Sequence, residues 1–398
     1  MLGRFKHTVF CSYTGYFVQA IINNFAPLLF LTFRQTFGFS YRQLSVLILF
    51  NFLFQLCVDA LSAVVIHRLG YRRCLVAAHV LAAVGLLSLG HLPFLLPNAF
   101  AGVIVSIFLY AVGSGLIEVI VSPLVEACPT KNKAASMSLL HSFYCWGQVS
   151  VVLLSTVFFS TVGIMHWRLL SNLWAIIPVC NAVYACLVPI PPVLDEAPGD
   201  PVRVLFRKPT FLLCALVMLC AGASELAMSQ WASAFAESGL GVSKTTGDLL
   251  GPCAFAVLMG TARVFYAAIS KKLPLPVALG ASAALCAVCY IVSSLSPWPL
   301  LSLLSCAVCG FSVGILWPGT FSLAAKEIPT GGTRLFALLA LFGDFGCAAG
   351  PFVVGQVTSL FGDRLQTGLL VGTLFPLVLA VAMLLQKRRR KSPGFSLA

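Results

Sequence analysis

The carboxylate of Glu118 lies in the middle of one of the most apolar stretches of this chain. Around it, polar side chains recur every four residues, at Tyr110, Ser114, Glu118, Ser122 and Glu126, while the rest of the stretch is apolar. On a helix of about 3.6 residues per turn, steps of four drift by only about 40°, so these side chains form one polar stripe. A carboxyl group on such a stripe suits two tasks, hydrogen bonding to a polar ligand and taking up or releasing a proton.

Other apolar stretches carry polar and aromatic side chains in similar patterns. Hydrogen-bonding groups beside aromatic rings suit a hydroxylated ligand such as a sugar. For Asn23 and Ser122 the alternative is hydrogen bonding that only packs helices together, and for Trp231 and Trp317 it is interfacial anchoring or filling. The candidate ligand-binding residues are Tyr16, Gln19, Asn23, Asn24, Glu118, Ser122, His141, Tyr144, Gln148, Glu225, Trp231 and Trp317.

The elements that carry these residues are predicted to be membrane-spanning helices. With 59% hydrophobic and 9% charged residues, the chain of 398 residues has too little polar surface to be a water-soluble globule. A stretch of about 20 apolar residues is long enough to cross the hydrocarbon of a bilayer as a helix. We count twelve such stretches, near residues 8–33, 43–66, 74–95, 99–126, 135–162, 169–190, 209–236, 247–269, 275–295, 299–325, 335–361 and 366–386.

Four acidic residues lie well away from the ends of these stretches: Asp59, Glu118, Glu225 and Asp344. An ionised carboxylate at the bilayer centre costs about 2.5 to 3.5 kcal/mol on insertion scales, so these side chains are expected to face protein or water and not lipid. A buried acid is also costly unless it is paired or protonated, which makes Glu118 and Glu225 candidates for proton coupling.

A second group of residues is expected to act between helices that move. Asp59 and Arg263 each lie nine positions before a basic residue at the end of their stretch, Arg68 and Lys272, so they occupy equivalent positions in the two halves. A static buried ion pair within one half is the alternative. The residues expected to make interdomain polar contacts are Asp59, Asp344, His141 and Arg263.

The net charge of +13 is explained by membrane orientation. If both termini are cytoplasmic, 19 Lys and Arg residues lie in cytoplasmic segments and five lie outside, which is the positive-inside pattern and requires no nucleic-acid partner. The basic run 387–391 is also suited to anionic lipid headgroups. The basic, then apolar N-terminus is predicted to be a retained first span, because its apolar part is too long for a signal peptide.

The 15 cysteines fall mostly inside apolar spans. No His or acid lies beside the two CAVC pairs, at 286–289 and 306–309, so the cysteines are expected to pack helices closely and not to bind a metal. We therefore expect no metal site and no cofactor.

The chain has the organisation of a duplication. Residues 191–208 contain prolines and acids and form the one plausible linker, so residues 1–190 and 209–398 are predicted to be two bundles of six helices each. The segments 126–136 and 326–336 share Pro-Thr at an offset of 200. Two such repeats around a central path are the usual construction of a transporter.

The loop after the second span reads AVVIHRLGYRR at 63–73. It resembles the signature of the major facilitator superfamily, which is Gly, three residues, Asp-Arg, any residue, then Gly-Arg-Arg. Arg68, Gly70 and Arg72 match, whereas Ala63, His67 and Tyr71 differ. The resemblance implies the twelve-helix fold of that superfamily, a cytoplasmic latch that includes Arg68, Arg72 and Arg73, and transport by alternating access of two six-helix bundles.

The stretch GSGLIEVIVSP at 113–123 is similar to the fourth helix of fucose-permease-like sugar:proton symporters. Glu118 and Pro123 match, and Ser122 stands where that family has Asn. The resemblance implies proton-coupled transport of a sugar or sugar-like solute with Glu118 as the coupling acid. That family pairs its acid with an Asp of the first helix, where this chain has Asn23 and Asn24, so Glu118 acts alone, acts with Glu225, or only binds solute in a uniporter.

Two other functions are compatible with parts of the sequence. Export of cationic amphiphilic compounds would use Glu118 and Glu225 as counter-charges and the aromatic rings as a cation-π surface. A membrane-embedded enzyme would use the acids and His141 for acid-base chemistry, but no HExxH or GxxxxGK[ST] motif occurs, and we expect no enzyme. The expected protein is a monomer in the plasma (inner) membrane whose partners are a small polar solute, a proton and the lipid bilayer.

Overall fold

The computed structural model describes residues 2–129, 133–193, 199–269 and 273–391. The described residues form helices and no β-strands, which satisfies backbone hydrogen bonding within each segment as a bilayer requires. Twelve helical segments are long and apolar enough to span a membrane, and this confirms the predicted count. They are Phe5–Phe37, Tyr41–Ser62, Tyr71–Leu95, Ala99–Ala127, Leu139–Thr161, Ile164–Leu187, Pro209–Ser229, Lys244–Tyr266, Leu275–Leu295, Pro299–Glu327, Gly332–Leu360 and Leu365–Gln386.

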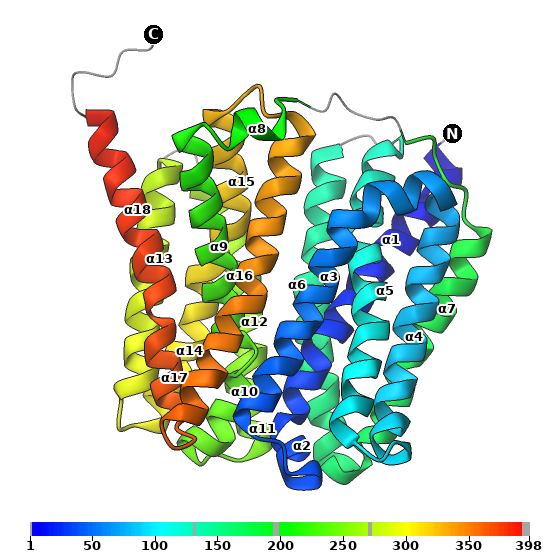
Figure 1. Ribbon diagram of the computed structural model, residues 1–398, viewed down its shortest axis with the longest axis vertical. Helices are drawn as coiled ribbons and strands as arrows, with labels where there is room; N and C mark the ends of the chain where they lie inside the picture. Colours follow the sequence, from blue (N-terminus) through cyan, green and yellow to red (C-terminus); the bar gives the residue numbers. More distant parts are fainter. Residues whose placement is uncertain (1, 130–132, 194–198, 270–272, 392–398) are drawn as a thin grey trace.

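The first half of the chain is the right-hand group of helices in Figure 1. Its elements are α1 (Leu2–Phe25), the 3-10 turn η1 (Ala26–Leu29), α2 (Phe30–Phe37), α3 (Tyr41–Leu69), α4 (Tyr71–Leu95), α5 (Ala99–Ala127), α6 (Lys133–Thr161), η2 (Ile164–His166) and α7 (Trp167–Leu187). The first span is thus interrupted at η1, where Pro27 has no amide hydrogen to continue the helix.

The second half is the left-hand group in Figure 1 and contains more interruptions. Its elements are α8 (Val202–Leu205), α9 (Pro209–Ser229), α10 (Ala232–Ala234), the π-helix η3 (Phe235–Gly239), α11 (Lys244–Asp248), the π-helix η4 (Leu249–Cys253), α12 (Ala254–Ile269), α13 (Leu275–Leu295), α14 (Pro299–Val313), α15 (Leu316–Glu327), α16 (Gly332–Leu360), α17 (Leu365–Gly372) and α18 (Leu374–Lys391).

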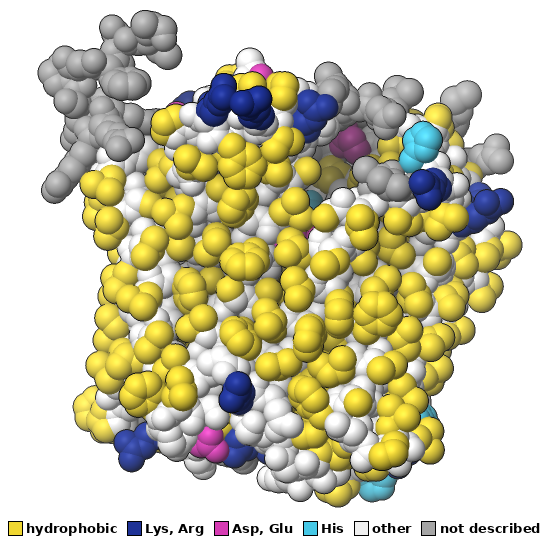
Figure 2. Space-filling model, in the orientation of Figure 1, with side chains coloured by type: hydrophobic (Ala, Val, Ile, Leu, Met, Phe, Trp, Pro, Cys, Tyr) yellow, Lys and Arg dark blue, Asp and Glu magenta, His cyan; other side chains and the backbone are white. Residues whose placement is uncertain are grey.

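The two groups of helices meet mainly where α3 packs on α16 and where α6 packs on α12. We call the end that carries the start of α1 and helix α8 the linker end, and the opposite end, with α2 and α11, the far end (Figure 1). The groups converge at the far end, and Figure 2 shows the surface hollowed between them at the linker end. On this face the hollow therefore lies at the linker end.

Close packing inside the second group depends on small residues. A methyl group added at Gly346 of α16 would collide with the Leu219 carbonyl oxygen of α9, and one added at Gly222 of α9 would collide with the Gly343 carbonyl oxygen of α16. Membrane helices gain stability from such close approach, because lipid provides no hydrophobic force that pushes helices together. This packing holds α16, and with it Asp344, against a firm support.

The end of the linker is attached to the second group. The Asp200 carboxylate accepts hydrogen bonds of 2.6 Å from both Lys208 Nζ and Thr330 Oγ1, and the Asp200 amide donates to the Thr330 carbonyl oxygen at 3.0 Å. Hydrogen bonds from Lys208 and Thr330 hold the pKa of Asp200 below its usual value. This part of the linker is therefore a fixed component of the second group.

Candidate functional site

The polar stripe of α5 faces α1 inside the first group. Gln19 Nε2 donates a hydrogen bond of 2.6 Å to Glu118 Oε2, and the hydroxyl groups of Tyr16 and Ser122 lie 3.1 Å apart. Glu118 is only partly buried, and the ring of His141 from α6, itself exposed, lies 5.4 Å from the ring of Tyr16. The structure thus brings together five of the residues predicted to bind ligand, on three helices.

Gln19 carries a hydrogen-bonding atom with no partner. Its side chain is 4% exposed, and its Oε1 atom is buried without a partner among the described residues. A buried acceptor without a donor costs free energy, and a bound solute or water that donates a hydrogen removes that cost. Gln19 is therefore suited to hold Glu118 with one end of its amide and a ligand with the other.

Asn23 is the centre of a separate buried network. Its Oδ1 atom accepts hydrogen bonds from Asn51 Nδ2 at 3.1 Å and from Gln55 Nε2 at 3.0 Å. Its Nδ2 atom lies 3.5 Å from the hydroxyl oxygen of Tyr144, and Gln55 Oε1 accepts from Ser114 Oγ at 3.0 Å. These contacts join α1, α3, α5 and α6 within the first group. The packing alternative for Asn23 therefore has direct support, and ligand binding by this residue stays a prediction.

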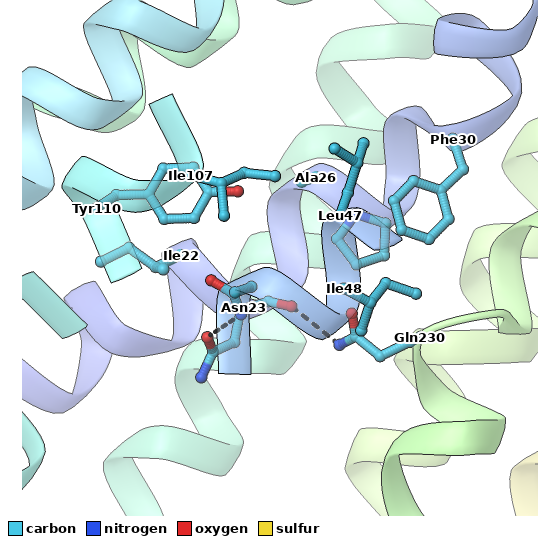
Figure 3. A pocket seen from close by; sticks show the side chains of 11 residues that line it. Ile22, Asn23, Ala26, Phe30, Leu47, Ile48, Ile107, Tyr110 and Gln230 are labelled. Atoms are coloured by element: carbon cyan, nitrogen blue, oxygen red, sulfur yellow. Dashed lines mark hydrogen bonds between the residues drawn. The ribbon is translucent and has the colours of Figure 1, made fainter. Parts of the chain in front are cut away.

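The break in the first span exposes a backbone carbonyl that the second group satisfies. In a continuous helix the amide of residue 27 would donate to the carbonyl of Asn23, but Pro27 has no amide hydrogen. Gln230, which follows α9, donates from Nε2 to the Asn23 carbonyl oxygen at 3.0 Å (Figure 3). A side chain of one group thus replaces a missing backbone hydrogen bond of the other.

A small cavity lies beside this contact, and Figure 3 shows Asn23 and Gln230 at its wall. Its volume is about 20 Å³, which is enough for one water molecule. Asn51 Oδ1, which also lines it, is buried without a partner among the described residues. A water bound there would satisfy this atom.

We predict that Gln230→Leu lowers stability only while residue 27 is proline. The substitution leaves the Asn23 carbonyl oxygen buried and unpaired, which costs about 1–3 kcal/mol. Pro27→Ala restores an amide hydrogen that reaches this oxygen, so Gln230→Leu is expected to cost much less in that background. Thermal unfolding of the four proteins of this cycle in detergent measures the difference, and equal costs in both backgrounds would refute the assignment.

The tenth span has an equivalent interruption, and Arg263 bonds to the carbonyl oxygen that it leaves free. Pro318 leaves the Gly314 carbonyl oxygen without its helical donor, and Arg263 Nε of α12 donates to that oxygen at 3.1 Å. Arg263 also acts electrostatically on Glu225 of its own group and on His141 of the other. Its hydrogen bond to Gly314 lies within the second group, and its interdomain role stays a prediction.

The remaining acids lie on α3, α9 and α16. Asp59 on α3 is partly buried and Asp344 on α16 is buried, and each has one carboxylate oxygen without a hydrogen-bond partner among the described residues. Glu225, on α9, is partly buried. Among the described residues no group of His, Cys, Asp and Glu side chains has the arrangement of a metal site.

The other predicted ligand-binding residues differ in accessibility. Trp231 is fully buried, donates from Nε1 to the Pro351 carbonyl oxygen at 2.9 Å, and its ring lies 5.3 Å from that of Phe30 in the first group. Trp317 is partly buried against Gly343 and Phe321. Trp231 therefore packs between the two groups, which favours the filling interpretation. Three further side chains are buried or partly buried: Asn24, which bonds to the Ala20 carbonyl, Gln148 and Tyr144.

Lys244 joins the two groups at the far end, and the sequence reasoning did not assign it a role. Its ammonium group donates to Asp248 Oδ1 at 3.0 Å, to Ser233 Oγ at 2.7 Å and, across the groups, to the Leu28 carbonyl oxygen at 2.7 Å. It also pairs with Glu237 at 3.0 Å, and burial raises the pKa of that carboxyl despite Lys244. The available signal was the spacing of four between Lys244 and Asp248, which places opposite charges on one helical face.

Further contacts cross between the groups at the same end. Arg34 pairs with Asp363 at 3.0 Å and lies over the ring of Tyr41, whose hydroxyl is 2.7 Å from that of Ser238. Two further contacts are Gln356 Nε2 to Ser45 Oγ at 3.1 Å and Thr156 Oγ1 to Asp248 Oδ2 at 3.3 Å. We refer to these, with the contacts of Lys244, as the far-end contacts. They hold the far end closed.

Comparison with known proteins explains this arrangement. The family model of the Major Facilitator Superfamily matches residues 8–351. The chain belongs to the major facilitator superfamily. The superfamily is one of transporters, so the twelve apolar helices indicate a multi-pass membrane protein. No individual curated protein matches the chain in sequence.

Solved structures of the superfamily share its fold at low sequence identity. A bacterial homologue of the human lysosomal transporter Spinster, inward-facing and unoccupied, has a TM-score of 0.80 at 15% identity and covers 99% of each chain. The D-xylose-proton symporter gives 0.78 at 13% identity, over 96% of this chain and 97% of that one. The E. coli fucose:proton symporter gives 0.66 at 17% identity, over 98% of this chain and 100% of that one. The sequence resemblance to the superfamily is thus confirmed in the fold.

The superfamily signature loop has one well-defined role here. Arg72, at the start of α4, donates to the carbonyl oxygens of Ala185, Cys186 and Val188 at 3.1, 2.6 and 2.8 Å, respectively. A guanidinium at the end of a helix satisfies carbonyls that have no partner inside it. Arg72 therefore ties α4 to α7 within the first group. Arg68 and Arg73 are exposed, and the latch to the second group stays a prediction for all three.

Proposed function

We propose that this protein is a secondary active transporter that moves a small polar solute, such as a sugar or sugar-like compound, across the membrane by alternating access. The observation that supports this most is the partly buried Glu118 at the middle of a span, held by Gln19 and surrounded by the hydroxyl groups of Tyr16 and Ser122. Such a wall offers donors and acceptors to a solute with several hydroxyl groups.

We further propose that transport is coupled to protons through Glu118. Its carboxylate accepts a hydrogen bond from the neutral amide of Gln19, and no ion pair joins it to a cation among the described residues. An acid without a fixed counter-charge gains or loses a proton with little rearrangement of its neighbours. Glu225 of α9 is the candidate second acid, and the primary role is assigned to Glu118, which is held by Gln19. Two of the structural neighbours are proton symporters of sugars, which agrees with this assignment.

The two halves, residues 1–190 and 209–398, are proposed to rock about the contact of α3 with α16. The far-end contacts keep one end closed while the linker end is hollow. The distribution of Lys and Arg supports a cytoplasmic linker end. We therefore propose that the state described here is open to the cytoplasm, in the plasma (inner) membrane, and that one chain supplies both halves of the path. The reaction is movement of the solute and not its conversion.

Uptake by purified protein in proteoliposomes tests this function. Radiolabelled sugars, polyols and nucleosides are supplied with and without an inward proton gradient. A sugar or polyol accumulated only with the gradient, and released when a protonophore is added, is the expected result. Solute uptake that never exceeds equilibrium, with or without the gradient, would exclude proton coupling and leave a uniporter.

A second candidate is transport of organic cations. Four acids, Asp59, Glu118, Glu225 and Asp344, lie inside the spans, and the rings of Tyr16 and His141 lie 5.4 Å apart beside the stripe of Glu118. An ammonium group gains from both acids and aromatic faces. A thermal-shift screen of sugars against organic cations distinguishes the two candidates, because the solute that binds the folded state raises the melting temperature.

A further inference from the structure

The small cavity beside the interruption at Pro27 is enclosed by both halves of the chain. All eleven residues that line it are buried, and all but one belong to α1, η1, α2, α3 and α5 of the first half. The exception is Gln230, which follows α9 in the second half (Figure 3). A volume of about 20 Å³ admits one water molecule and no larger solute.

The hydrogen bonds around Asn51 determine which of its side-chain atoms is left for a ligand. Asn51 Nδ2 donates to Asn23 Oδ1 at 3.1 Å, and Gln55 Nε2 donates to the same oxygen at 3.0 Å. Because Asn23 Oδ1 is the acceptor, the amide nitrogen of Asn51 points at it and Asn51 Oδ1 points elsewhere. Asn51 is 7% exposed, and this oxygen is buried without a partner among the described residues. The cavity that Asn51 lines therefore needs a hydrogen-bond donor.

Two other side chains bring oxygens to the same cavity. Gln230 Nε2 is used by the Asn23 carbonyl oxygen at 3.0 Å, which leaves Gln230 Oε1 as an acceptor. Tyr110 is 2% exposed, and its hydroxyl group makes no hydrogen bond to another of the described residues. Figure 3 shows Tyr110 and Gln230 on opposite sides of the view. The lining thus offers two amide oxygens, which only accept, and one hydroxyl, which can donate.

Water matches these three groups in size and in chemistry. Its two hydrogens suit the amide oxygens of Asn51 and Gln230, and its own oxygen accepts from the hydroxyl of Tyr110. About three hydrogen bonds are usual for a buried water. A metal cation would also be attracted to oxygens, but no lining residue is acidic, and an uncompensated charge in a buried site is costly.

We propose that this cavity is a water-binding site, in which one water molecule joins Asn51 and Tyr110 of the first half to Gln230 of the second. The site goes beyond the function proposed above, because it holds neither the transported solute nor the coupling proton. Gln230 thus contacts the first half twice, directly through the Asn23 carbonyl oxygen and indirectly through the water. Separation of the halves at Gln230 removes one of the three partners, so the water is held most firmly while this contact is closed.

Hydroxyl-radical labelling of the purified full-length protein by X-ray radiolysis, read by mass spectrometry, tests the proposal. Radicals formed from a bound water oxidise the side chains beside it even when those side chains are buried. Tyr110 is therefore expected to be labelled several-fold faster than Tyr290. Tyr290 is fully buried, donates from its hydroxyl to the Ser224 carbonyl oxygen at 2.7 Å and does not line the cavity. Equal rates for the two tyrosines would overturn the proposal.

Two variants identify the source of the label. Asn51→Leu removes an acceptor and makes the wall more apolar, so the labelling rate of Tyr110 should fall to that of Tyr290. Gln55→Leu is the matched control, since Gln55 also donates to Asn23 but does not line the cavity, and Tyr110 should keep its parent rate there. If water reached Tyr110 only when the halves open, the label would survive Asn51→Leu, and that result would also contradict the site. Should this variant fail to fold, the two tyrosines of the parent still decide.

Labelling is measured without solute and without a proton gradient. Failure of gradient-driven uptake would refute the proposed coupling and leave the labelling result standing. Slow labelling of Tyr110 would refute the water site and leave gradient-driven uptake standing. The two proposals can therefore fail separately.

Discussion

Glu118→Gln is expected to abolish solute accumulation driven by a proton gradient while exchange of labelled for unlabelled solute across the membrane continues. The amide still bonds to Gln19 and to a hydroxyl group of the solute, so the binding wall persists, but it cannot take up a proton. Loss of a charge-assisted hydrogen bond worth about 1.5–3 kcal/mol also predicts that solute affinity falls by about tenfold or more. Proteoliposome uptake and counterflow, measured on the same preparation, check both effects.

Glu126→Gln is the matched control, since Glu126 lies on the same stripe of α5 two turns farther along. Its uptake should remain near that of the parent. Glu225→Gln separates the two candidate acids, because it should slow uptake without abolishing the response to the gradient if Glu118 acts alone. Concentrative uptake by Glu118→Gln equal to that of the parent would remove this acid from coupling.

Lys244→Met is expected to open the far end. It leaves Glu237 and the fully buried Asp248 beside each other without their cation, and removing one partner of a buried ion pair costs about 3–5 kcal/mol. Opening hydrates both carboxylates and recovers part of this cost. The equilibrium between the closed and open far ends should then shift toward the open form by about a hundredfold. Spin labels at the exposed positions 35 and 245 measure the change as a longer distance between the halves.

Arg42→Met provides the control for this experiment. Arg42 is an exposed cation at the same end, so its removal should leave the distance unchanged. An unchanged distance in Lys244→Met as well would show that the far end is held by its other contacts, such as Arg34 with Asp363, and would contradict the central role assigned to Lys244.

The spans and their number were predictable, because a helix that crosses hydrocarbon needs a long apolar stretch whatever its neighbours are. The stripe of Glu118 was predictable for a similar reason, since spacing along one helix determines which side chains share a face. Hydrogen-bond partners on different helices were not predictable from the sequence. Nothing in the sequence around Gln230 indicates that it bonds to the carbonyl released by Pro27, and Lys244 looks like any charged residue at the end of a span.

Asn23 illustrates the same limit within one half. The sequence made Asn23 a candidate ligand-binding residue, but it does not reveal that Asn51 and Gln55 of the next span donate to the side chain of Asn23. Arg263 is the converse case. Its position matched that of Asp59 in the other half, yet its hydrogen bond goes to the carbonyl left free by Pro318, which only the path of the chain through α14 and α15 reveals.

The hydrogen bond between Gln230 and the carbonyl ahead of Pro27 has an evolutionary consequence. A homologue in which another residue replaces the proline regains the continuous backbone hydrogen bonds of the helix and no longer needs the glutamine. A homologue that loses the glutamine first has an unpaired carbonyl oxygen inside the protein. The two positions should therefore co-vary across homologous chains, with proline and glutamine inherited together and the proline lost before the glutamine.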